Sequence, residues 1–335
     1  MQATFLRRLK TIPAVVGLML LTTALLPLLL LVMVIVDAVR AARTKTPWMG
    51  TRLLVFGWLY LWADTLGLLL MLGIQLITGF GVWRDGRVRM AARVQRWWAG
   101  FLLGSVRLIF QLRFEVDGLE VASPGPVLVF MQHASMPDTL LPTNFITRRF
   151  GIQLRFVVKR ELLVDPCLDI AGHWLPNYFV DRGATDPAQE VARIKALADQ
   201  LGPNDGVLIY PEGTRFTREK QGRAIAKLRE GDPAIFALAE PLRHVLPPRL
   251  GGPLALLDGD AQADVVFVAH HGFGGFGSMS RIWRGAMVRR TIRMAFWRVP
   301  RAEIPAEPDA RVRWLYDHWH RMDAWMAERE GEGEA

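Results

Sequence analysis

Val127-Leu-Val-Phe-Met-Gln-His-Ala-Ser-Met-Pro-Asp138 combines an apolar run with a histidine, a proline and a carboxylate. The five leading apolar residues predict a buried strand that delivers His133 to its carboxyl-terminal end. Pro137 fits the first turn of a helix, where a missing backbone N–H costs nothing. His133 should therefore lie on a strand-to-helix turn, with Asp138 on the helical turn behind it. A histidine held by a carboxylate has a fixed tautomer and can act as a general base.

A His-x4-Asp pair also arises by chance, and the aspartate is then a helix cap while the histidine lies on the surface. A spacing of five does not place two side chains on one face of a helix. Catalysis therefore requires that the turn fold Asp138 back onto His133. Ser135 lies between them, and we expect it to cap the helix rather than to act as a nucleophile.

Two later motifs favour the catalytic interpretation. The first is Phe179-Val-Asp-Arg182, and the second is Tyr210-Pro-Glu-Gly-Thr-Arg215, which ends an apolar strand-like run. In this order and at these separations, the three motifs resemble those of the glycerolipid acyltransferase family, the acylglycerol-phosphate acyltransferases. The resemblance covers roughly residues 110–300.

The resemblance implies transfer of an acyl group from a thioester, either acyl-CoA or acyl-carrier protein, to the free hydroxyl of a lysophospholipid. A hydroxyl is a poor nucleophile at neutral pH, so His133 would accept its proton while Asp138 orients the ring. The acceptor is itself the nucleophile, and the sequence has no Gly-x-Ser-x-Gly motif for a covalent serine. No cofactor is expected besides the thioester co-substrate.

The resemblance also implies a site for the acceptor's glycerol phosphate. The family uses the arginines that match Arg182 and Arg215, whose planar guanidinium groups can bind phosphate through paired hydrogen bonds. Without the family, either arginine alone would more often be a surface ion pair. The other expected binding residues are Lys159 and the rest of the third motif, namely Glu212, Gly213 and Thr214.

Two departures from the family pattern leave the acceptor's head group open. Pro176 stands where the second motif often has glycine, and the fourth motif is Val245-Leu-Pro-Pro-Arg-Leu-Gly-Gly252. The insertion after Arg215 resembles a longer subgroup that includes lysophosphatidic and lysocardiolipin acyltransferases. The first expectation is conversion of 1-acylglycerol-3-phosphate to phosphatidate. The alternatives are remodelling of lysocardiolipin or lysophosphatidylglycerol, and a non-catalytic membrane protein that binds lipid.

The composition limits the classes of partner that the protein is expected to bind. The formal net charge of +9 suits nucleic acid, anionic lipid or a phosphorylated substrate. The basic residues cluster beside apolar segments and form no recognisable nucleic-acid module, so we expect membrane lipid rather than nucleic acid as the partner. Cys167 is the single cysteine, which excludes an intrachain disulfide and fits a reducing compartment.

Residues 1–96 are expected to anchor the chain in the cytoplasmic (inner) membrane, with the active site facing the cytosol. The segment 13–36 has no charged residue, and Leu53–Trp83 has only Asp64, so two apolar helices could form a membrane-anchoring hairpin. A cleavable signal peptide is the alternative for the first segment. Helices that lie in the interface without spanning are the alternative for both, because a basic hinge separates them.

Residues 97–330 are expected to form an α/β domain with a mixed central sheet and helices on both faces. Its start, Trp97–Leu112, is predicted to be a helix on the membrane surface, and residues 331–335 a disordered tail. The predicted strands are 114–118, 127–131, 154–158, 178–180, 207–210, 264–269 and 291–296. The clearest predicted helices are 187–201, 218–230 and 311–330, the last with tryptophans that could face the sheet or the membrane.

Two further patterns are not expected to carry chemistry. Gly272-Phe-Gly-Gly-Phe-Gly277 has the spacing of a dinucleotide-binding loop, but arginines follow it where an acidic residue is needed. We predict a flexible loop at the membrane surface. His270-His271 suggests a metal, but no cysteine or carboxylate cluster supports one, so no metal is predicted.

Overall fold

The computed structural model describes residues 2–181, 186–259, 262–276 and 278–332. The chain divides into two compact units, and each is described by itself. The first comprises Met1–Arg113, Val158–Phe179 and Ser278–Arg290, and the second comprises Phe114–Val157, Val180–Gly277 and Thr291–Ala335.

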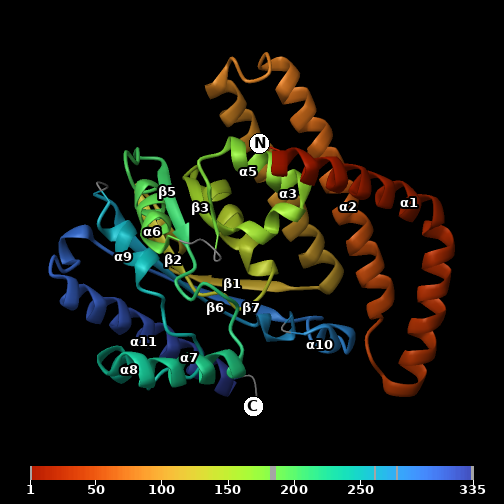
Figure 1. Cartoon of the computed structure of the whole chain (residues 1–335). Helices are drawn as coiled ribbons and strands as arrows, with labels where there is room; N and C mark the ends of the chain where they lie inside the picture. Colours follow the sequence, from red (N-terminus) through yellow and green to blue (C-terminus); the bar gives the residue numbers. More distant parts are fainter. Residues whose placement is uncertain (1, 182–185, 260–261, 277, 333–335) are drawn as a thin grey trace. The chain divides into compact units, whose positions relative to one another are not determined.

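A seven-stranded sheet is the framework of the α/β fold, and most of its residues belong to the second unit (Figure 1). The strand order is β1-β7-β6-β2-β5-β3-β4. All seven predicted strands are present: β1 Arg113–Asp117, β2 Val127–Met131, β3 Gln153–Lys159, β4 Tyr178–Val180, β5 Asp205–Ile209, β6 Asp264–His271 and β7 Thr291–Val299. β2 pairs in parallel with β5 and β6, whereas β6 and β7 are antiparallel, so the predicted mixed sheet is confirmed.

Both faces of the central strands are covered. All five side chains of β2 are buried although they alternate between the two faces, which explains the unbroken apolar run in the sequence. The C-terminal helix α11 (Pro308–Glu332) packs on β6, where the Phe267 ring stacks on His318 and also contacts Trp314 and Trp319. These tryptophans therefore face the sheet rather than a membrane. Gly331 and Glu332 belong to α11, so the prediction of disorder is wrong for these two residues, and residues 333–335 lie outside the described residues.

Capping residues explain where several helices begin. Asp165, Asp186, Thr217 and Asp232 each accept a hydrogen bond from the backbone N–H three residues later, and proline follows three of them. The helices are α4 Arg148–Phe150, α5 Pro166–Trp174, α6 Pro187–Ala196, α7 Arg218–Gly231, α8 Pro233–Ala239, α9 Gly251–Leu257 and α10 Met279–Trp283. Thus α6 ends earlier than predicted, and α7 matches its prediction to within a residue.

The predicted N-terminal hairpin is present in the first unit. It consists of α1 (Gln2–Thr44) and α2 (Met49–Ile77), and the Asp37 carboxylate accepts from the N–H groups of Gly50 and Thr51 at the start of α2. Both helices are long and apolar enough to cross a membrane by length and composition. This favours the expected association with a membrane.

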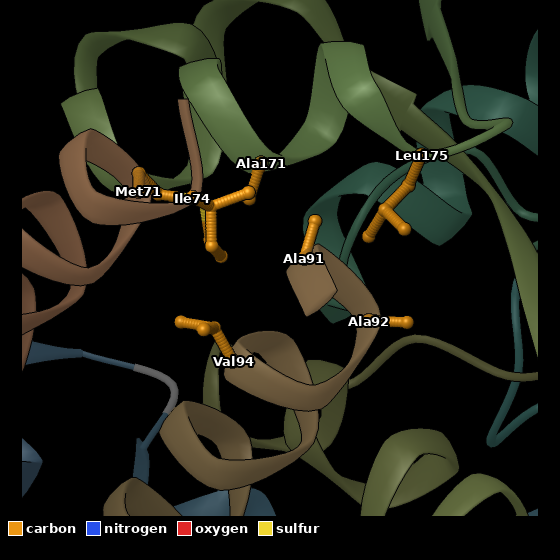
Figure 2. Packing of buried hydrophobic residues seen from close by; sticks show 7 residues of the cluster. All are labelled: Met71, Ile74, Ala91, Ala92, Val94, Ala171 and Leu175. Atoms are coloured by element: carbon orange, nitrogen blue, oxygen red, sulfur yellow. The ribbon is translucent and has the colours of Figure 1, made fainter. Parts of the chain in front are cut away.

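The helix predicted to lie on the membrane surface is the second half of a longer helix. α3 runs from Arg84 to Phe110, so the expected domain boundary at residues 96 and 97 falls inside it. Figure 2 shows its apolar face meeting α2 and α5. The contacting residues are Met71, Ile74, Ala91, Ala92, Val94, Ala171 and Leu175. Helices α2 and α3 therefore share a core with α5.

Asp169 of α5 is fully buried and links α5 to α1 within the first unit. It accepts hydrogen bonds from the guanidinium groups of Arg7 and Arg8 on α1, at 3.0 to 3.2 Å for its carboxylate oxygens. We expect the double substitution Arg7→Ala and Arg8→Ala to lower the free energy of unfolding by about 3 kcal/mol, because a buried carboxylate loses its two cationic partners. Denaturation of the detergent-solubilised protein measures the change.

The matched control is Arg223→Ala on α7. Its ion pair with Glu219 is exposed, with 68% and 79% of the two side chains accessible, so this substitution should cost less than about 1 kcal/mol. Equal losses in the two variants would show that the Asp169 cluster contributes no more than a surface pair.

Candidate active site

His133 and Asp138 are in contact, as the sequence predicts. His133 follows β2 after one intervening residue, and Pro137–Leu140 forms a 3-10 turn rather than the start of an α-helix. The turn brings His133 Nδ1 to 3.0 Å from Asp138 Oδ1 and 3.2 Å from Oδ2. The Asp138 side chain is fully buried, whereas 11% of the His133 side chain is accessible. The pair therefore consists of a buried carboxylate and an imidazole that is partly accessible to solvent.

Asp138 also closes the turn that carries it. Its Oδ2 accepts hydrogen bonds from the backbone N–H groups of Ala134 at 2.8 Å and Ser135 at 2.7 Å. The Ser135 side chain makes no such contact, since its buried Oγ has no hydrogen-bond partner among the described residues. The prediction that Ser135 caps the helix is therefore wrong.

The surroundings keep Asp138 ionised. Burial by itself raises the pKa of this carboxyl, but hydrogen bonds from His133 and His270 outweigh burial and lower the pKa to about 2. A carboxylate can only accept, so the Nδ1 of His133 carries the hydrogen between them. The Nε2 of His133 is then left with a lone pair that can accept a proton from a substrate.

Glu212 supports the same turn from the third motif. It is buried, its Oε2 accepts from the backbone N–H of His133 at 3.4 Å, and its Oε1 accepts from the N–H of Leu246 at 3.3 Å. Burial raises the pKa of Glu212 well above its usual range despite these two bonds. Glu212 therefore binds the backbone of His133 and of Leu246. The sequence did not predict this role.

The third motif reaches His133 because β2 and β5 are parallel neighbours whose carboxyl ends meet at one edge of the sheet. Gly213 lies at φ 64° and donates its N–H to the Tyr210 carbonyl, which makes a tight turn in a conformation that suits glycine. The Tyr210 ring lies 4.7 Å from the His133 ring, and the Phe216 N–H donates to the His133 carbonyl at 2.8 Å. The third motif and the His133 turn are therefore in direct contact at this edge of the sheet.

The structure shows the surroundings of only some of the basic residues that the sequence points to. The Arg215 side chain is exposed, and Lys220 Nζ donates to Thr214 Oγ1 and to the Arg215 carbonyl. Sequence reasoning missed Lys220, although it lies in the insertion after the motif. Arg182 lies outside the described residues, and Lys159 ends β3 in the first unit, so the binding roles of both stay predictions.

The helix α11 holds the segment that reaches Glu212. Asp323 accepts from the backbone N–H groups of Arg243, His244 and Val245 at 2.6 to 3.1 Å. Trp319 Nε1 donates to the Leu246 carbonyl at 2.9 Å. No local signal in the sequence points to these contacts, because the partners lie more than seventy positions apart.

The glycine-rich segment after β6 differs from its prediction. It contains a 3-10 turn, Phe273–Phe276, and both phenylalanines are buried, so the predicted loop on the membrane surface is wrong. Phe273 packs against the ring of His270. Within the described parts of the chain, no group of three or more His, Cys, Asp or Glu side chains is arranged to hold a metal ion.

Comparison with known proteins locates this site in a family. Residues 113–249 match the family model described as Acyltransferase. A 1-acyl-sn-glycerol-3-phosphate acyltransferase of Pseudomonas aeruginosa is 32% identical over 141 residues, which are 41% of this chain and 51% of that protein. The chain therefore aligns with about half the length of this relative.

Among solved structures, the 1-acyl-sn-glycerophosphate (LPA) acyltransferase PlsC of Thermotoga maritima is similar, with 14% identity and a TM-score of 0.41. That match covers 77% of this chain and 96% of the other. The segment that matches the family model contains His133, Asp138 and the third motif. Over this segment, the chain is similar to acyltransferases that act in glycerolipid synthesis.

Proposed function

We propose that this protein transfers a fatty acyl group from an acyl thioester to the free hydroxyl of 1-acylglycerol-3-phosphate and so forms phosphatidate. The observation that carries the proposal is the contact between His133 and the ionised Asp138 at the edge of the sheet. The Pseudomonas relative, a 1-acyl-sn-glycerol-3-phosphate acyltransferase, supports the choice of acceptor.

The geometry supports a direct transfer. His133 Nε2 accepts the proton of the acceptor hydroxyl while the oxygen attacks the thioester carbonyl carbon. The carbon–sulfur bond then breaks, and the departing sulfur takes the proton from the imidazolium. Asp138 stabilises the imidazolium that forms and does not itself take the proton. The chemistry is the same for acyl-CoA and for acyl-carrier protein, so the dyad does not select the donor.

The location of the reaction follows from the substrates. A lysophospholipid resides in the bilayer, whereas the thioester donor arrives from the cytosol, so we infer an active site at the cytosolic face of the membrane. The two apolar helices α1 and α2 support this placement by their length and composition. Arginines near an anionic leaflet add about 1 kcal/mol each to membrane affinity, and salt screens this part.

The test is acyl transfer by the purified full-length protein in detergent. The acceptors are 1-acylglycerol-3-phosphate, lysophosphatidylglycerol and lysocardiolipin, each offered with acyl-CoA and with acyl-carrier protein. We expect the highest kcat/KM with 1-acylglycerol-3-phosphate. Preference for one of the other two acceptors would make this a remodelling enzyme, and binding without turnover on any acceptor would leave only the lipid-binding alternative.

Arg215 tests the acceptor site. We expect Arg215→Lys to raise KM for 1-acylglycerol-3-phosphate by about 10-fold and to leave KM for the donor within about 2-fold, because lysine keeps the charge but loses the planar pair of donors. Arg218→Lys is the matched control, since Arg218 is also exposed and lies three residues further on. A rise in the donor KM instead would assign Arg215 to the thioester carrier.

A further inference from the structure

His270 lies at the end of β6, and its side chain is fully buried. Its Nε2 is 3.3 Å from the carbonyl oxygen of Gln132 and 3.5 Å from Asp138 Oδ2. Both neighbours are acceptors, so Nε2 carries a hydrogen, which it donates to the Gln132 carbonyl while it stays close to the Asp138 carboxylate. The Asp138 carboxylate therefore lies between two imidazoles, with His133 nearer Oδ1 and His270 beside Oδ2.

The contact belongs to a reciprocal pair that joins β2 to β6 past their last paired residues. Gln132 Nε2 donates to the His270 carbonyl at 2.5 Å, while His270 Nε2 faces the Gln132 carbonyl. The regular pairing of the two strands ends at Met131 and Val268. Gln132 directly precedes His133, so β6 fixes the backbone under the catalytic histidine as well as the carboxylate behind it.

Packing alone does not account for an imidazole at this position. His270 touches the Phe273 ring edge-on, with the centroids 5.3 Å apart, as an apolar side chain could. Its Nδ1 has no hydrogen-bond partner in the described part of the chain. A buried polar atom without a partner costs free energy, and an apolar residue of similar volume would avoid that cost. What an apolar residue would lack is the N–H that bonds the Gln132 carbonyl and lies 3.5 Å from Asp138 Oδ2.

We propose that His270 is a positioning residue that holds Asp138 through its Oδ2 and thereby fixes the orientation of the catalytic imidazole. The proposal rests on the proposed function, in which His133 is the general base. His270 acts through Asp138 and need not touch either substrate.

Removing the His270 N–H changes the negative charge that Asp138 presents to His133, whereas a change in packing alone does not. The full carboxylate charge then faces His133, which favours the protonated imidazole, so the acidic limb of the pH profile of kcat/KM moves to higher pH. Other ionisable groups around the two histidines are constant in this comparison. They are Tyr210 and Glu212 after β5, His271 on β6, Arg293 on β7, His244, and Asp323 and Glu330 on α11.

The experiment compares three variants of the full-length protein. His270→Leu fills the space without a donor, and His270→Gln can place an amide N–H near the position of Nε2. Phe273→Leu disturbs the packing of the same ring without touching the carboxylate. We expect His270→Leu to lower kcat about 10-fold with both KM values within about 2-fold, and to move the acidic limb up by about 0.5 pH unit or more. His270→Gln should recover most of both changes, and Phe273→Leu should leave the limb in place.

A second measurement does not depend on turnover. Diethyl pyrocarbonate modifies neutral imidazole, so its rate at His133 against pH, followed by peptide mass spectrometry, reports the protonation of this residue. The midpoint should rise in His270→Leu and return in His270→Gln. If no variant or wild-type protein transfers acyl groups yet the midpoint moves, the proposed function fails and the hold of His270 on the dyad stands.

Two results would overturn the inference. One is that His270→Leu leaves kcat, the acidic limb of the kcat/KM profile and the modification midpoint of His133 unchanged. The other is an equal loss of kcat in His270→Leu and Phe273→Leu without a shift of limb or midpoint, which would make His270 a packing residue. If His270→Leu does not fold, His270→Asn replaces it, because its shorter amide lies near Nδ1 and cannot reach Asp138. The inference would then also fail if the Asn and Gln variants had the same acidic limb in the pH profile of kcat/KM and the same midpoint for modification of His133.

Discussion

Replacing His133 with alanine should lower kcat by about 10²- to 10⁴-fold, the usual cost of losing a general base. The substitution removes only the imidazole. The backbone N–H of His133 still donates to Glu212, and its carbonyl still accepts from the Phe216 N–H, so the turn keeps its main-chain contacts. Single-turnover acyl transfer measures the loss, and donor affinity should stay within about 2-fold.

Two checks accompany this variant. The melting temperature should fall only modestly, because Asp138 keeps its bonds from the N–H groups of Ala134 and Ser135 and the main-chain bonds of His133 remain. Added imidazole should recover part of the rate by entering the space that the side chain vacates. Turnover close to wild type would exclude His133 as the base and, with it, the proposed mechanism.

Asp138→Asn should be nearly as severe, with kcat lowered by about 10³- to 10⁴-fold through the wrong tautomer of His133. Asp138 Oδ2 accepts from two backbone N–H groups at 2.7 and 2.8 Å, so the single amide oxygen of asparagine is drawn to that position. The amide N–H2 then takes the place of Oδ1 and faces His133 Nδ1. That nitrogen must accept, so the hydrogen moves to Nε2 and the ring can no longer take a proton from the substrate.

Nitrogen-15 NMR of labelled His133 follows the tautomer directly. The wild type should carry the hydrogen on Nδ1 and the Asn variant on Nε2. Asp138→Ala separates tautomer from charge, because it removes the carboxylate without presenting a donor to Nδ1, and it should retain more activity than the Asn variant if the tautomer is the main effect. A mild loss in both variants would reduce Asp138 to a residue that closes the turn.

The sequence by itself determined the strands and the central contact of the site. Apolar runs predict the buried strands β2, β5 and β6, and the other four predicted strands, which are shorter, alternating or partly exposed, are also present. The contact between His133 and Asp138 was also predictable, because the two residues lie on one short turn whose reach the proline and the spacing limit. The third motif follows β5, and parallel pairing with β2 then brings it to the same edge. The hairpin of α1 and α2 follows from two apolar runs of sufficient length, the first uncharged and the second with Asp64 alone.

The tertiary structure decided what surrounds the dyad. Glu212, His270 and Asp323 reach the His133 turn, or the segment that supports it, from positions about 80 to 140 residues away, and no local pattern predicts these contacts. The register between β2 and β6 places His270 beside Asp138, and the packing of α11 on β6 brings Asp323 to the segment under Glu212. Such contacts depend on which elements pair and how they are aligned, and the free energy that selects them comes from burial across the whole core. For the same reason, the sequence divided α3 at the wrong place and left Phe273 on the surface, since only the packed partners, α5 for one and His270 for the other, show which side of each segment is buried.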